Sequence, residues 1–425
     1  HPFRIRIGQF VLVDAGRRIS VSGDVAVGEK GWSVGLDVAI DAISSDRLLA
    51  LWPLAAVPKT RTWLADNVAS GELFDVKAAL RLAPDREPRL SLGYEYRAAE
   101  VRFLRTLPPV KDGAGYATII DNAYTLVVDR GRITAPRGGD VDVTGSVLKV
   151  PDIRIKPAPA EITLHSKSSI TGALSLLDEP PFRFMTKANR PVDVAEGRAE
   201  LTSVLGLTLQ KKVRPEDVSY DVKGRLLDVR SDRVVPGQAL AADALTIAAT
   251  RAGMSITGPG TLSGVPFDVT WTQLFGPDHR GKSSVEGTVE LSPVFAKAFS
   301  IGLPEGMIRG KAVGQLKLAI DAGQRTSFRL TSDLTGLRMA LPEIGWLKDA
   351  GRAGRLEVEG TLGAPAEVTA LRLQGAGLDA SGDVNLRADG GLERARFGKV
   401  TVGDWFDGPV DLVGRGKGRT VGIAV

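Results

Sequence analysis

The sequence has no cysteine and only three histidines, His1, His165 and His279, in 425 residues. Without cysteine there are no disulfide-stabilised scaffolds, no Cys-ligated zinc or iron–sulfur clusters and no thiol catalysis. Three scattered histidines argue against a multi-histidine metal site. No serine and acidic residue accompany a histidine in a pattern that indicates a catalytic triad. We therefore expect a protein that is not an enzyme, with no metal and no cofactor.

Long apolar runs are also missing. The longest, Leu48 to Val57, contains Pro53, whereas a bilayer-spanning helix needs about 20 apolar residues. No signal peptide is visible. The chain opens on His1 rather than Met and stops within an alternating segment, so we expect a fragment whose anchor or targeting sequence lies outside it.

The sequence also has little excess of charge of one sign, because 55 basic and 50 acidic residues leave a net charge of only +5. Both signs are interspersed along the chain. A nucleic-acid-binding protein would more often show a basic stripe with interleaved aromatics. We therefore expect no nucleic-acid partner.

A period-2 alternation of apolar and polar residues dominates the sequence, as in Phe3 to Ile7 or Val265 to Trp271. This pattern places one apolar and one polar row on opposite faces of a strand, whereas strands of a parallel α/β sheet would read as continuous apolar runs. The 49 glycines suit tight turns. Helices are predicted only at Thr60 to Gly71, Ile170 to Leu177 and Pro293 to Phe299.

No linker or fixed-period repeat divides the chain. The sequence therefore predicts a mostly β fold: a long, continuous, curved antiparallel sheet that forms an elongated groove, with a few short helices. Glycines within strands, Gly23, Gly287 and Gly360, would permit the curvature. Within this one architecture we distinguish residues 1–72, which end in the Trp-containing helix, a central groove segment 73–291, and a truncated groove segment 292–425.

The apolar face of such a sheet must be covered, closed on itself or occupied by a ligand. A gutter-shaped sheet could meet this demand with lipid acyl chains. The residues predicted to line the groove are Val218, Tyr220, Val222, Leu245, Ile247, Val265, Phe267, Val269, Trp271, Val285, Val289, Leu316, Leu318, Ile320, Leu356 and Val358. The helix with Trp63 could be a lid, an interfacial element or, as we favour, a cap on a sheet edge.

Three stretches of the sequence resemble motifs of a known protein family and occur in the same order as in that family: LWPLAAVPKTRTWLADNVASGELFDV (51–76), GVPFDVTWTQLF (264–275) and LTGLRMALPEIGWLKDAG (334–351). The matching positions are Arg61, Trp63, Leu64 and Gly71, then Pro266 and Trp271, then Pro342, Gly345, Trp346, Lys348 and Gly351. They resemble the AsmA-like family of bacterial lipid-transfer proteins, in particular its YhdP branch, which is related to TamB. The resemblance implies a periplasmic β-groove anchored in the inner membrane of a Gram-negative bacterium. It also implies phospholipids, both membranes and envelope proteins as partners, with phospholipid movement toward the outer membrane.

Two glycine-rich segments imitate phosphate-binding loops. GPDHRGKS (276–283) fits the pattern G-x-x-x-x-G-K-S, but the alternation that follows it predicts a strand instead of the helix that a phosphate loop requires. We interpret it as a hairpin turn. GRGKGRT (414–420) is interpreted as a turn with solvated charges, or in a functional version as a weak headgroup contact.

Two other functions remain open. An envelope assembly factor could template the strands of an outer-membrane protein with the backbone of a sheet edge. A glycan-binding module or an all-β enzyme is less favoured, because it would need a compact pocket with converging polar groups and aromatic platforms.

Overall fold

The structure, a computed structural model, describes residues 3–14, 16–210, 213–303, 306–363, 365–387, 391–415 and 422–424. Its strands form a long antiparallel sheet and a separate three-stranded sheet, with few short helices. The predicted mostly β fold is therefore confirmed. The chain divides into two compact units, His1–Leu226 and Leu227–Val425, which are described one after the other.

Unit 1 contains eleven complete strands, four α-helices and one 3-10 helix among its described residues. The strands are β1 (Phe3–Asp14), β2 (Arg17–Gly28), β3 (Gly31–Ser44), β4 (Val68–Ala83), β5 (Arg86–Val101), β6 (Val110–Ile120), β7 (Ala123–Thr134), β8 (Asp140–Asp142), β9 (Val147–Val150), β10 (Ala158–Ser169) and β11 (Glu196–Leu209). The helices are α1 (Ser45–Leu51), α2 (Pro58–Asn67), α3 (Ile170–Leu177), α4 (Phe184–Lys187) and η1 (Pro215–Asp217). Strand β12 (Ser219–Ser231) contains the boundary between the units.

Unit 2 continues with β13 (Leu240–Thr250), β14 (Gly253–Leu262), β15 (Val265–Leu274), β16 (Lys282–Leu291), β18 (Ala312–Asp321), β19 (Ser327–Ser332), β22 (Arg355–Thr361), β23 (Glu367–Gly375), β24 (Leu378–Leu386), β25 (Leu392–Val402), β26 (Phe406–Val413) and β27 (Gly422–Ala424). The small sheet is made of β17 (Ile308–Gly310), β20 (Leu337–Leu341) and β21 (Trp346–Lys348). Helix α5 (Pro293–Ala298) and the 3-10 helices η2 (Pro277–His279) and η3 (Pro342–Ile344) lie in connections.

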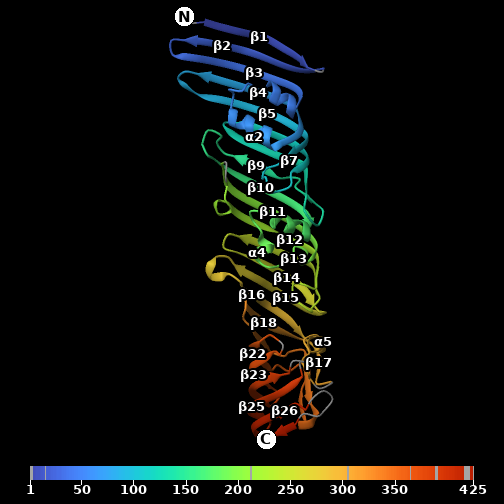
Figure 1. Cartoon of the computed structure of the whole chain (residues 1–425). Coiled ribbons are helices and arrows are strands. Elements are labelled where there is room, and N and C mark those ends of the chain that lie inside the picture. Colours follow the sequence, from blue (N-terminus) through green and yellow to red (C-terminus); the bar gives the residue numbers. More distant parts are fainter. Residues whose placement is uncertain are drawn as a thin grey trace. The chain divides into compact units, whose positions relative to one another are not determined.

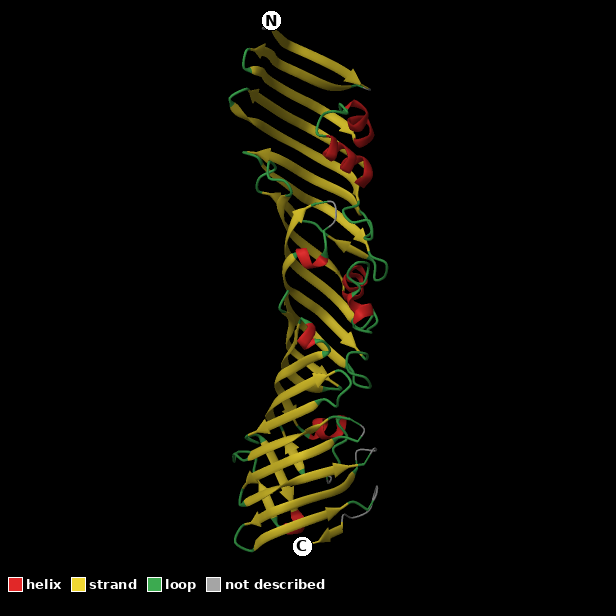
Figure 2. Ribbon diagram, turned by 60° about the vertical axis from the view of Figure 1, so that its left-hand side comes forward, coloured by secondary structure: helices red, strands yellow, loops and turns green. Residues whose placement is uncertain are grey.

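The two ends of the unit 1 strands differ. At one end the chain turns tightly, as at Asp121–Asn122 between β6 and β7, where both residues have positive φ (48° and 64°) as in a type I′ hairpin turn. At the other end two connections are long and carry helices: α1 and α2 join β3 to β4, and α3 and α4 join β10 to β11. Figure 1 shows β1 to β5 side by side, and Figure 2 shows the helices in red beside the strands.

Unit 2 repeats this asymmetry with the small sheet. Strand β17 lies in the connection from β16 to β18, and β20 and β21 lie in the connection from β19 to β22. Both connections leave from the strand end where Leu291 opposes Ala312 and Ser332 opposes Leu356. The small sheet therefore belongs to one end of the unit 2 strands.

The helix predictions are confirmed in part. Helix α3 spans Ile170–Leu177 as predicted, and α5 ends one residue earlier than predicted. The prediction for Thr60 to Gly71 is wrong at both ends. The helix starts at Pro58, which occupies its first turn after Val57, and it stops at Asn67 because Val68 already pairs with Val101. Helices α1 and α4 were not predicted.

Glycines allow close approach of neighbouring strands. A Cβ on Gly287 (φ 149°) would lie 2.2 Å from the carbonyl oxygen of Asp268, and one on Gly360 would lie 2.0 Å from that of Glu367. The β22–β23 register also shifts between Glu359 and Gly360. These predicted glycine positions are thus places where no side chain fits. The predicted segment boundaries at residues 72 and 291 fall within β4 and at the end of β16.

Candidate binding face

Directly opposed residues on neighbouring strands form rows across the unit 2 sheet, and several of these rows are apolar. One row runs through Val269, Gly287, Leu316, Leu330, Val358 and Leu371. The row beside it contains Ile247, Ile256, Trp271, Val285, Leu318 and Phe328. Opposed side chains lie on the same face of an antiparallel pair. The strands of unit 2 therefore share one apolar face.

Most of the predicted groove residues lie on this face. The register places there Ile247 of β13; Val265, Phe267, Val269 and Trp271 of β15; Val285 and Val289 of β16; Leu316, Leu318 and Ile320 of β18; and Leu356 and Val358 of β22. Leu245 lies in β13 next to a register shift, and Tyr220 and Val222 are half-buried residues of β12. Val218 lies before β12, at the end of η1.

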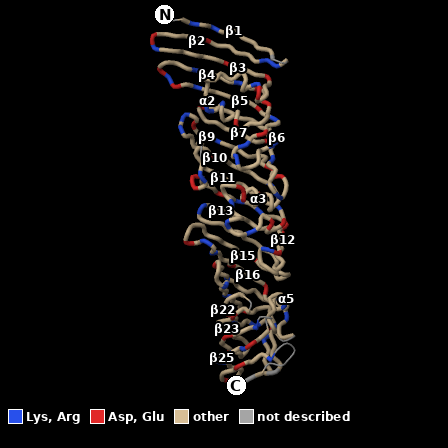
Figure 3. Tube along the Cα trace, in the orientation of Figure 1, with Lys and Arg blue, Asp and Glu red and all other residues tan. Residues whose placement is uncertain are grey.

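The opposite face of unit 2 carries charges in matched rows. Glu286 opposes Lys317, with 3.4 Å between carboxylate oxygen and Nζ, and Arg329 pairs with Glu359. Figure 3 shows both signs of charge interspersed along the trace. Exposed pairs of this kind contribute little stability, but they keep this face in water. The sheet of unit 2 therefore has one wet and one apolar face.

The apolar face of unit 2 is covered at one strand end. There the small sheet packs against the main sheet in a buried cluster that contains Val265, Val289, Leu291, Ala312, Leu330, Leu334, Leu337, Met339, Trp346, Leu378, Ala380, Val400 and Val402. Trp346 is almost completely buried, and its Nε1 donates to the carbonyl oxygen of Gly375 at 3.1 Å. Trp346 therefore has a packing role. Its side chain fills a core between the small sheet and β23.

Lys348 is fully buried beside Trp346, and sequence reasoning did not assign it a role. Its Nζ donates to the carbonyl oxygens of Leu334 (2.7 Å), Leu337 (2.9 Å) and Asp349 (3.3 Å). Burial lowers the pKa of this amine. In β21 Trp346 and Lys348 are buried and Leu347 between them is exposed, so the position of Lys348 two residues after a tryptophan was the sequence signal for its burial. Lys348 therefore holds the chain around the small sheet together.

Away from the small sheet the apolar face is only half-buried. Val269, Trp271, Val285 and Leu318 are all intermediate in exposure. Trp271 is opposed by Ile256 and Val285, so its ring lies in an apolar row. We call the row through Trp271, together with Val269, the open zone, and we call the buried cluster under the small sheet, which includes Leu330, the covered zone. The predicted lining thus divides between a filled core and a partly exposed apolar surface.

Unit 1 has an apolar face too. None of the predicted lining residues belongs to strands β1 to β11, although apolar and polar residues alternate in their sequences. One row runs through Phe10, Val21, Val38, Ala78, Leu92, Ile119, Tyr124 and Val150. On the other face Arg81 bonds Asp37 at 2.7 Å. Among the described residues of β1 to β3 only Ile43 is buried. The first three strands therefore present an apolar surface that the described part of the chain leaves uncovered.

Three tyrosines interrupt this apolar face without charging it. The hydroxyls of Tyr94 and Tyr124 lie 3.1 Å apart, and the Tyr96 hydroxyl donates to the carbonyl oxygen of Val127 at 2.8 Å. Burial raises the pKa of all three phenols above its ordinary value of 10.0. All three therefore remain neutral at physiological pH, with their hydroxyls hydrogen-bonded.

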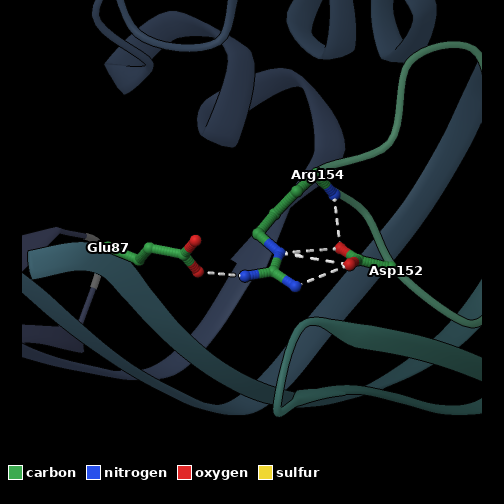
Figure 4. A network of polar contacts seen from close by, with 3 residues as sticks. All are labelled: Glu87, Asp152 and Arg154. Atoms are coloured by element: carbon green, nitrogen blue, oxygen red, sulfur yellow. Dashed lines mark hydrogen bonds and ion pairs between the residues drawn. The ribbon is translucent and has the colours of Figure 1, made fainter.

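Figure 4 shows a polar network at the hairpin end of unit 1 that has a structural role. Arg154, in the loop after β9, bonds Asp152 with Nη2 to Oδ2 at 2.7 Å and also bonds Glu87 of β5. Hydrogen bonds from Arg154 lower the pKa of Asp152 to about 2. The network fixes the loop against β5 and leaves no free carboxylate for acid–base chemistry.

The segment 276–283, whose sequence fits the phosphate-loop pattern, forms the hairpin connection between β15 and β16, as predicted. Residues Pro277–His279 form a 3-10 turn, and strand β16 begins at Lys282 where a phosphate loop would begin a helix. Most of the second segment, residues 416–420, lies outside the described residues. His165 contacts Thr202, with 3.1 Å between Nδ1 and Oγ1, and these two residues are opposed in β10 and β11.

In the part of the chain that the structure describes, no three His, Asp or Glu side chains are grouped as a metal site would require. No helix there is long and apolar enough to cross a membrane. The sequence matches no protein-family model, no curated protein and no solved structure. The family resemblance therefore stays a prediction.

Proposed function

We propose that this chain is a segment of a periplasmic lipid-transfer protein of the AsmA-like type, which shelters phospholipid acyl chains on the apolar face of its sheet. The observation that carries the proposal is the apolar row through Phe10, Val21 and Val38, which the described part of the chain leaves uncovered, together with the open zone of unit 2. An acyl chain in water costs about 0.8 kcal/mol per methylene, so an apolar surface removes a large barrier to its movement. Many weak contacts along the rows would hold a chain without trapping it.

The parent protein would be anchored in the inner membrane and conduct phospholipids toward the outer membrane, as the resemblance implies. The charged face supports this proposal because it would keep a long sheet soluble while the other face carries lipid. The covered zone would not carry lipid, since its side chains already fill the space between the two sheets. We therefore assign acyl-chain contact to the open zone and to the first three strands of unit 1.

The test is lipid extraction and native mass spectrometry of the gently purified chain. The chain offers a matched pair of substitutions in β18. Leu318→Asp places a carboxylate in an apolar row between Val285 and Phe328, whereas Ala319→Asp, one residue later, faces Ser284 and Ser327 on the polar side. We expect bound phospholipid in the wild type and in Ala319→Asp, and a loss in Leu318→Asp. Equal lipid content in all three folded proteins, or none in the wild type, would contradict the proposal.

A second candidate function is the templating of outer-membrane protein strands. It is favoured by β1, whose twelve residues pair only with β2 among the described strands. An unpaired edge of that length could accept a further strand by backbone hydrogen bonds. Loss of client assembly with unchanged lipid content, after Val11→Pro in β1, would select this function instead.

A further inference from the structure

The insertion between β3 and β4 exposes an apolar surface that the proposed acyl-binding face does not use. Leu54 is 75% exposed, Val57 62%, Phe103 53% and Trp63 42%. Leu51 and Leu104 are exposed beside them. We call these six residues the insertion surface. Its members come from α1, α2, the turn between them and the loop after β5.

Specific contacts hold these segments in one arrangement. The rings of Trp63 and Phe103 are in contact, with centroids 6.3 Å apart. Arg61 Nη2 donates to the carbonyl oxygen of Leu49 at 3.1 Å, which ties α2 to α1. The backbone N–H of Arg102 donates to the carbonyl oxygen of Asn67 at 2.8 Å, which ties the loop to α2. The exposed apolar side chains thus sit on a fixed support.

Basic residues accompany the insertion surface. Lys59, Arg102 and Arg105 are exposed, and none of them has an ion-pair partner among the described residues. Aromatic and aliphatic side chains flanked by unpaired cations are complementary to an anionic bilayer, with rings at headgroup depth and cations on lipid phosphates. The insertion surface also lies next to the apolar face of unit 1. The pair Ala42–Phe74 belongs to that face and lies close to Ser44–Glu72, the last pair of β3 and β4 before the chain enters the helices.

We propose that the insertion surface docks onto the headgroup region of a membrane rich in anionic phospholipid. Leu54, Val57 and Trp63 would enter the interface, and Lys59 and Arg105 would contact lipid phosphates. This goes beyond the sheltering of acyl chains, because it assigns the place where the protein meets a bilayer. The docking proposal and the proposed function can fail independently, because vesicle binding and co-purified lipid are measured in separate experiments.

The experiment is flotation of the purified chain with phosphatidylcholine vesicles prepared with and without phosphatidylglycerol. We expect binding to the anionic vesicles that salt weakens. Leu54→Gln with Val57→Gln should lower the partition coefficient about tenfold on loss of apolar insertion. Lys59→Gln with Arg105→Gln should lower it by about tenfold only on anionic vesicles, and should remove most of the salt dependence.

A matched control is Ile120→Gln with Val313→Gln, which removes two side chains of similar exposure (60% and 58%) that do not belong to the insertion surface. This control should bind like the wild type, and circular dichroism should show all variants folded. Failure of the wild type to float with anionic vesicles would overturn the proposal, as would equal binding by all variants. A dimer that only Leu54→Gln with Val57→Gln dissociates, without vesicle binding, would assign the surface to a second copy and overturn it as well.

Discussion

The Nζ of Lys348 lies 2.7 Å from the carbonyl oxygen of Leu334, and both residues are fully buried. The amine reaches this carbonyl from β21, fourteen residues further along the chain. Gly354 lies beside the contact, where a Cβ would be only 3.2 Å from the Cε of Lys348. The small sheet is therefore fixed by a cation whose partners are all backbone oxygens.

Replacement of Lys348 by methionine should destabilise unit 2. The apolar stem is kept, but three carbonyl oxygens lose their donor, and a buried unsatisfied acceptor costs about 1–3 kcal/mol. We expect the free energy of unfolding to fall by about 3 kcal/mol, measured by urea denaturation followed by tryptophan fluorescence. Leu347→Met, at the exposed position next to it, is the control and should change little. Equal stability of wild type and Lys348→Met would contradict the assigned role.

The same residue predicts a pH dependence. Burial lowers the pKa of Lys348 in the folded protein below the ordinary 10.5, so between the two values the unfolded chain binds more protons. Stability that depends on this residue should therefore rise with pH across that window. The difference in unfolding free energy between wild type and Lys348→Met should grow as the pH rises toward 10.5, the ordinary pKa of the group. A difference that shrinks over this range would show that the charged form is preferred in the folded state.

The turn between β6 and β7 provides a test in unit 1. Asn122 has a φ of 64°, a left-handed conformation that costs residues with a Cβ about 1–2 kcal/mol but suits asparagine and glycine. Asn122→Ala should lower stability by about 1 kcal/mol, whereas Asn122→Gly should be close to neutral. Thermal unfolding measures both. If the alanine and glycine variants are equally stable, the turn does not have this geometry in solution.

Much of the fold could be predicted because alternation specifies faces directly. The pattern Val265, Phe267, Val269, Trp271 requires one face, and the pairing of β15 with β16 places Phe267 opposite Val289 and Trp271 opposite Val285 without a shift. Helix α3 forms where it was predicted, and the structure shows that Ser169 caps this short apolar stretch, with its Oγ accepting from the N–H of Gly172.

What the sequence did not reveal depends on long-range packing. The apolar character of Val289 and Leu356 is the same whether lipid or protein covers them, and only the fold shows that both pack in the buried cluster of the small sheet. Lys348 reads as a surface charge because its three carbonyl partners belong to the backbone and leave no residue pattern. The end of α2 was misplaced because the pairing of Val68 with Val101 overrides local helix propensity.

The division between covered and open zones predicts different costs for one substitution at two sites in β16. Val289 is buried under the small sheet, so Val289→Ala should lower the unfolding free energy by about 2 kcal/mol whether or not lipid is bound. Val285, four residues earlier on the same face, is half-buried between Trp271 and Leu318, so Val285→Ala should cost under about 1 kcal/mol in delipidated protein. If acyl chains pack against the open zone, the cost at Val285 should increase when phospholipid is restored, while the cost at Val289 stays constant. Chemical denaturation of both variants, with and without lipid, measures the four values. A lipid-dependent cost at Val289 but not at Val285 would place the acyl chains in the covered zone and contradict the proposed division.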